Sequence, residues 1–162
     1  MIATGLRGRV RDALLVAALA STSCNAYFNP AVDLVVHVTN GDAGDRVVVA
    51  IDKFARDRQL TAYPASNDSP VPESIRQLNE KTTHYLTGTR HGKGRSLTFL
   101  NASPACKVVK VVERSEHWST ESEADLVALR TALSGLAGVT VEEGARFDGT
   151  KGGRGLNEYC QD

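Results

Sequence analysis

Residues 32–39 read Val-Asp-Leu-Val-Val-His-Val-Thr, and this stretch decides the fold class. Valine or leucine occupies every second position, so one side of the extended chain is fully apolar. Because side chains alternate between the two faces of a β-strand, the pattern predicts a strand with one face against a core. Residues 40–45 are rich in glycine and aspartate and end the strand, and Asp42 or Asp45 can cap a following helix.

Two helices and four further strands follow from the same kind of pattern. In chain order we expect a helix over 46–59, a proline-rich loop over 61–74, a short helical turn over 73–80, strands over 83–90, 96–101 and 106–114, a second helix opening at 119–123, and a strand beginning at 139–142. Thr120 and Glu123 form a capping-box pattern for the second helix, and Gly138 suits its C-terminal end. The tail from Phe147 onward is glycine-rich and predicted to be irregular.

This order predicts an α+β domain over 32–162, with a single, mainly antiparallel sheet and two helices on one face. Residues 133–141, Leu-Ser-Gly-Leu-Ala-Gly-Val-Thr-Val, resemble the last helix and strand of ferredoxin-like folds. That resemblance implies a ferredoxin-like order of elements. It is an analogy of fold and implies nothing about function.

The composition limits the classes of function. The chain has 162 residues, of which 41% are hydrophobic and 23% charged, enough for one packed domain. Nineteen basic residues balance nineteen acidic ones, and aromatic residues make up 6%. A dedicated nucleic-acid binder would be strongly basic, so no nucleic-acid partner is expected.

The N-terminus carries the pattern of an export signal. Three arginines at positions 7, 9 and 11 precede an apolar run over 13–20, which is too short to span a bilayer. Small residues at 21–23 then lead to Cys24. This order resembles the signal peptides of bacterial lipoproteins.

The lipoprotein resemblance implies a signal peptide over 1–23, a lipid on Cys24 and a tether over 24–31. It also implies an envelope protein anchored in a membrane and facing the periplasm or the exterior. One alternative is a secreted protein cleaved after Ala26. The other is a buried amphipathic N-terminal helix with an incidental cysteine.

Once Cys24 is assigned to lipid, Cys106 and Cys160 remain as an even pair. In an oxidising compartment such a pair predicts a disulfide that ties the tail to the middle of the domain. Two free thiols or a metal-binding pair are the alternatives. No CxxC is present and no histidine has ligand spacing, so neither a metal nor a cofactor is expected.

Two short histidine motifs suggest an enzymatic alternative. His37 precedes Thr39 by two positions, and His117 precedes Ser119 in the same way. Paired motifs of this kind resemble those of the two-histidine phosphoesterases, which hydrolyse cyclic or 2′–5′ phosphodiesters. The resemblance implies acid–base catalysis by the histidines and phosphate binding by the hydroxyls. Incidental histidines on a solvated surface are the competing interpretation.

Positive charge gathers at the expected hairpin turn, at Arg90, His91, Lys93 and Arg95. These side chains either keep the end of the hairpin solvated or contact an anionic partner.

Together these features favour a small envelope lipoprotein that binds another protein, as an inhibitor or immunity protein against an envelope-acting toxin or lysozyme would. The phosphoesterase and a structural or assembly role in the envelope are the alternatives. The expected partners are a protein and, through the lipid on Cys24, a membrane.

Overall fold

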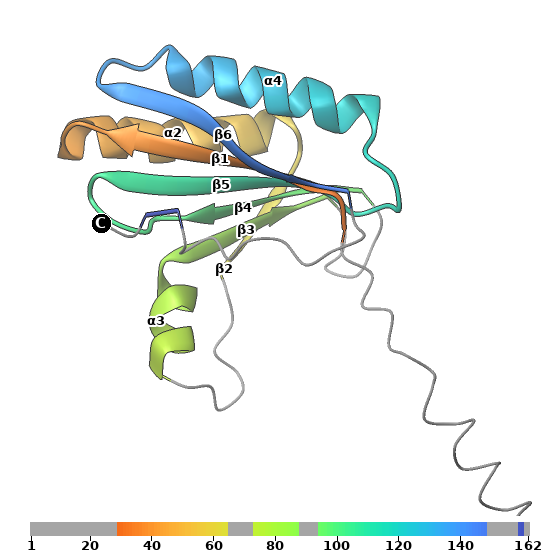
Figure 1. Cartoon of the computed structure of the whole chain (residues 1–162), viewed down its shortest axis with the longest axis horizontal. Helices are drawn as coiled ribbons and strands as arrows, with labels where there is room; N and C mark the ends of the chain where they lie inside the picture. The colour runs from red at the N-terminus through yellow and green to blue at the C-terminus, as the bar shows by residue number, and fades with distance from the viewer. Residues whose placement is uncertain (1–28, 65–72, 88–93, 149–158, 161–162) are drawn as a thin grey trace, which may run out of the picture.

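The structure, a computed structural model, describes residues 29–64, 73–87, 94–148 and 159–160 (Figure 1). The chain is α+β, and the described residues form one open six-stranded sheet and three helices. The strands are β1 (Ala31–Val38), β2 (Thr61–Pro64), β3 (Thr82–Leu86), β4 (Arg95–Leu100), β5 (Cys106–Glu113) and β6 (Val139–Phe147). The helices are α2 (Gly41–Asp57), α3 (Glu73–Glu80) and α4 (Thr120–Ser134).

The strands lie in the order β2-β3-β4-β5-β1-β6, and every neighbouring pair is antiparallel. β1 is therefore an inner strand that pairs with β5 on one side and β6 on the other. The two edges of the sheet are β2 and β6. The expectation of a single, mainly antiparallel sheet is confirmed.

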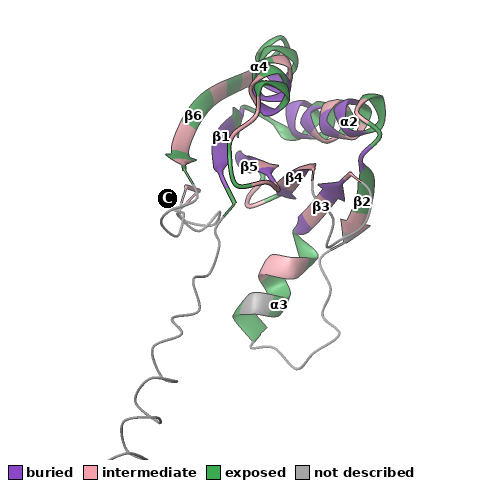
Figure 2. Cartoon of the chain, turned by 90° about the vertical axis from the view of Figure 1, so that its right-hand side faces the viewer, coloured by how far each residue is buried: buried purple, intermediate pink, exposed green. Residues whose placement is uncertain are grey.

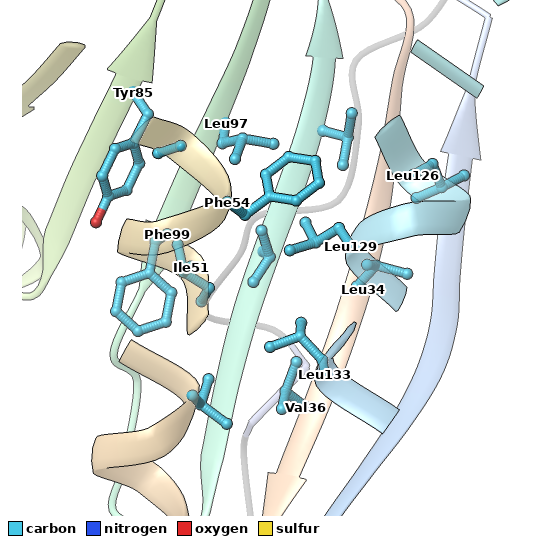
Figure 3. Close-up of a cluster of buried hydrophobic side chains, with 14 of the residues drawn as sticks. Leu34, Val36, Ile51, Phe54, Tyr85, Leu97, Phe99, Leu126, Leu129 and Leu133 are labelled. Atoms are coloured by element: carbon cyan, nitrogen blue, oxygen red, sulfur yellow. The ribbon is translucent and has the colours of Figure 1, made fainter. Parts of the chain in front are cut away.

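α2 and α4 lie side by side against the same face of the sheet (Figures 1 and 2). Figure 3 shows side chains from both helices and from the sheet converging on one apolar cluster. The alternating residues of β1 that face this cluster are Val32, Leu34, Val36 and Val38. Full burial of each large apolar side chain contributes about 1.5–3 kcal/mol, so this cluster is the main source of stability.

α2 begins at Gly41, earlier than the expected start at residue 46. Asn40 is its N-cap, and the Asn40 side chain accepts a hydrogen bond from the Ala43 amide at 2.9 Å. Ala43 and Gly44 are both buried. The cap is thus Asn40 and not the expected Asp42 or Asp45, which lie inside the helix, and the first turn also packs against the sheet.

α4 begins at the predicted place, with a slightly different cap. Ser119, rather than Thr120, accepts the hydrogen bond from the Ser122 amide, at 3.1 Å. Its C-cap is Gly135, and Gly138 follows with a φ of +77°. That left-handed conformation suits glycine and turns the chain into β6.

Two strands, β2 and β1, differ in their boundaries from the sequence expectations. Residues 61–64 form edge strand β2, although prolines favoured a loop there; proline is tolerated on an edge because its missing N–H can face solvent. β1 begins at Ala31, inside the expected tether, and Ala31 is buried. β6 begins at Val139, as predicted, and runs to Phe147, the residue from which an irregular tail was expected.

α3 confirms the expected helical turn over 73–80. It lies on the other side of the sheet from α2 and α4, next to β3 (Figure 2). The Thr82 hydroxyl donates to the Leu78 carbonyl at 2.7 Å and so joins the end of α3 to the start of β3.

Candidate functional site at the edge of the sheet

β6 is a long edge strand with a bulge in the middle. Val32 lies opposite Arg146 and Leu34 lies opposite Glu143, so the single residue Asp33 faces the two residues Gly144 and Ala145. A bulge of this kind leaves one backbone amide out of the ladder and increases the local twist. Glycine inside a strand is a known sequence signal for a bulge.

The backbone directions along β6 follow from hydrogen bonds at the end of β1. The Val38 amide donates to Ala105, on the β5 side, at 2.8 Å, and the Thr39 amide donates to Gly138, on the β6 side, at 3.0 Å. The backbone N–H and C=O groups of successive residues point alternately to the two sides of a strand. The odd-numbered residues of β1 therefore point their N–H and C=O groups toward β6. Their partners Thr140 and Glu142 therefore face β1.

The intervening residues Val141 and Glu143 consequently point their N–H and C=O groups away from β1. Among the residues that the structure describes, no strand lies beyond them. The same direction applies to Val139, but its amide already donates to the Leu136 carbonyl at 3.2 Å. We call residues 140–143 the open segment of β6.

Tyr159 closes the edge at the bulge, just past the open segment. Its hydroxyl accepts a hydrogen bond from the Ala145 amide at 3.0 Å and donates one to Asp33 Oδ2 at 2.8 Å. Gly144 leaves room for the ring, since a Cβ there would lie 3.0 Å from a Tyr159 ring carbon. The bulge amide thus has a protein partner, whereas no described residue accepts a hydrogen bond from the amides of Val141 and Glu143.

A disulfide holds Tyr159 in place. The Sγ atoms of Cys106 and Cys160 are 2.02 Å apart, at disulfide distance, as the sequence predicts. We call Tyr159 and Cys160 together the C-terminal clasp. Cys106 belongs to β5 and Tyr159 contacts β1 and β6, so the clasp joins three strands.

Asp33 is a fully buried carboxylate beneath the clasp. Lys110, opposite it on β5, brings Nζ to 3.4 Å from Asp33 Oδ1 and also lies over the Phe147 ring at 4.8 Å. Burial raises the pKa of the Asp33 carboxyl, and the Tyr159 hydrogen bond and the Lys110 charge only partly offset this effect. None of Asp33, Lys110 and Tyr159 was predicted from the sequence as a site residue.

Two of the three charged side chains along the middle of β6 are already paired. Arg146 binds Glu143 at 3.1 Å and Glu123 of α4 at 2.9 Å. Glu143 also lies 3.7 Å from Arg130. The Arg146 hydrogen bond lowers the pKa of Glu123.

The third charged side chain, Glu142, is exposed on the opposite face of the sheet from these pairs. None of the ion pairs in the described ranges involves it. The open segment therefore presents two outward backbone positions and one unpaired carboxylate.

The structure does not bring the two histidine motifs together. His37 is exposed near the end of β1, opposite Cys106, at the start of β5. His117 follows the far end of β5, whose first and last residues, Cys106 and Glu113, are about 23 Å apart at roughly 3.3 Å per strand residue. Ser119 caps α4, and Thr39 binds Gly138 through its amide, so the phosphoesterase alternative gains no geometric support.

Of the expected basic cluster, Arg90, His91 and Lys93 lie outside the described residues. Arg95 begins β4, and its guanidinium binds Asp125 of α4 at 2.5 Å. Arg58 of α2 binds the other oxygen of the same buried carboxylate at 2.6 Å. Arg95 thus ties the sheet to the helices.

The remaining expectations concern the N-terminus and metals. Cys24, the signal peptide and most of the expected tether lie outside the described residues. Within the described ranges, no group of three or more potential ligands could hold a metal ion, and no helix has the length and apolar character needed to cross a membrane. A cavity of about 320 Å³ lies between α3 and β4, beside Cys160.

Comparisons with protein-family models, curated proteins and solved structures found no match to this chain.

Proposed function

We propose that the chain is a lipid-anchored envelope protein that binds another protein by strand addition at the open segment of β6. The observation that carries the proposal is the outward direction of the backbone groups of Val141 and Glu143 on an edge strand. An extended segment of a partner can pair with such groups and add a strand to the sheet. Inhibitors and immunity proteins against a toxin or lysozyme are the class of binder we favour.

The envelope location is supported by the disulfide together with the N-terminal pattern. Disulfides persist in oxidising compartments such as the periplasm, and Cys106 and Cys160 lie at disulfide distance. The mass of the membrane-extracted protein tests the anchor: we expect its first residue to be Cys24 with a diacylglycerol group. An unmodified N-terminus at Tyr27 would contradict it.

The sheet leaves only a short part of its edges open, as a specific site for strand addition requires. Exposed strand edges promote aggregation, and proteins limit them with bulges, charges and prolines. In this chain edge strand β2 ends at a proline, Pro64, and the bulge and the clasp interrupt edge strand β6. Residues 140–143 are left as a short pairing site.

Replacing Val141 with proline tests the proposal. Proline removes the outward N–H of Val141 and places a ring where the partner strand would lie, while the ladder to β1 is kept. We expect partner binding to weaken by about tenfold or more. The measurement is quantitative capture from envelope extracts, followed by titration with the purified partner.

Val141→Ala is the matched control, because it shortens the same side chain and keeps the N–H. Both variants should retain the circular dichroism spectrum of the folded protein, and Val141→Ala should bind within about twofold of wild type. Equal binding by Val141→Pro and wild type would show that the partner contacts another surface.

We further propose that the core follows the ferredoxin-like order of elements. β1, α2, β4, β5, α4 and β6 occur in that sequence, and their strands lie side by side as β4-β5-β1-β6. This arrangement supports a β-α-β-β-α-β core extended by β2 and β3.

A further inference from the structure

The chemistry of the open segment restricts the kind of strand that it can accept. Its outward backbone groups belong to Val141 and Glu143, with Glu142 between them. A residue of an added antiparallel strand that lies opposite Glu142 is in a non-hydrogen-bonded pair. Side chains approach most closely in such pairs.

Glu142 is the charge that such a partner residue would meet. It is exposed, and it lies opposite Val35, which offers no charge to neutralise it. Glu143 points to the helix face, where Arg130 and Arg146 already balance it. The added strand therefore meets an unpaired negative charge on one face and a neutralised one on the other.

We infer that the partner is an extended segment of another protein with a lysine or arginine opposite Glu142; this inference rests on the proposed strand addition. The segment is short because both ends of the site are closed. The Val139 amide is bound to Leu136 at one end, and the Ala145 amide is bound to Tyr159 at the other.

A second copy of this chain fits the site less well. Antiparallel pairing of two open segments can place Val141 opposite Val141, Val141 opposite Glu143, or Glu143 opposite Glu143. The second register puts two Glu142 side chains opposite each other, and the third puts two Glu143 side chains opposite each other. Like charges in such positions repel. None of the three puts a basic side chain opposite Glu142, so we assign the site to a different protein.

Two synthetic peptides test the inference: acetyl-Thr-Val-Lys-Val-Thr-amide and the same peptide with glutamate in place of lysine. Each is titrated into the full chain at low salt while backbone amide chemical shifts are followed by NMR. We expect the lysine peptide to bind at least threefold more tightly and to shift the amides of 140–143. Added salt should reduce the difference, because the Debye length is about 8 Å at 0.15 M.

Variants assign the preference to one side chain. In Glu142→Gln the ratio of the two affinities should fall below twofold, and in Glu142→Lys it should reverse. Glu116→Gln, which neutralises an exposed glutamate in the loop after β5, should keep the wild-type ratio.

The outcomes separate this inference from the proposed function. If both peptides bind equally well and Val141→Pro abolishes binding, strand addition stands and the basic partner is wrong. If neither peptide binds, or if Val141→Pro binds both like wild type, the strand-addition proposal fails as well. A dimer in sedimentation that Val141→Pro dissociates would assign the edge to a second copy and overturn the inference.

Discussion

Among single residues, Asp33 is a buried carboxyl beneath the clasp whose protonation the fold disturbs. Burial raises the pKa of its carboxyl above 3.8, the ordinary value, because no water solvates the charge. Protonated Asp33 is therefore favoured by folding. The contribution of Asp33 to the free energy of unfolding should be fully present below about pH 3.8 and should be lost as the pH rises through the folded-state pKa of Asp33. Carboxyl ¹³C NMR measures that pKa directly, and Asp33→Asn identifies the resonance.

Lys110 and Tyr159 both lower the pKa of Asp33, so their removal should raise it further. Lys110→Met removes the positive charge, and Tyr159→Phe removes the hydrogen bond to Oδ2. An Asp33 midpoint at or below 3.8 in the wild type would show that these two partners outweigh burial.

At the scale of elements, sequence pattern predicted what local periodicity determines. The alternating valines and leucine of β1, the start of α4 and the extent of α3 all follow from neighbouring residues. β2 was missed because pairing with β3 forms it despite weak local signals. The start of α2 was predicted too late, because Asp42 and Asp45 were considered as its caps and Asn40, the actual N-cap, was not.

The candidate site was not predicted because contacts between residues far apart in the sequence form it. Gly144 could have indicated a bulge, but the partner of that bulge is Tyr159, which lies beyond 149–158 in the chain. Tyr159 and Asp33 are separated by 126 residues, and no spacing rule joins them. The disulfide could be predicted because only two cysteines remain once Cys24 is assigned to lipid, and an oxidising compartment favours their pairing.

At the scale of the whole molecule, the disulfide decides how firmly the clasp is held. It closes a loop with a sequence separation of 54 residues. In the chain-entropy model a loop of that length stabilises the folded state by about 4 kcal/mol, because it restricts the unfolded chain. Reduction, or the double variant Cys106→Ser with Cys160→Ser, should lower the free energy of unfolding by an amount of this order in urea titrations.

Loss of the disulfide should change the folded state only near the clasp and should leave the middle of the sheet unchanged. Without the disulfide, the clasp keeps the two Tyr159 hydrogen bonds, and each contributes about 1 kcal/mol. Hydrogen exchange at the Ala145 amide should therefore accelerate more than exchange at Val109, an amide in the middle of β5. Tyr159→Phe with the disulfide intact is the control, and of these two amides it should accelerate exchange at Ala145 and leave exchange at Val109 unchanged. Equal acceleration at both amides after reduction would mean that the disulfide stabilises the whole sheet and does not specifically close the edge of β6.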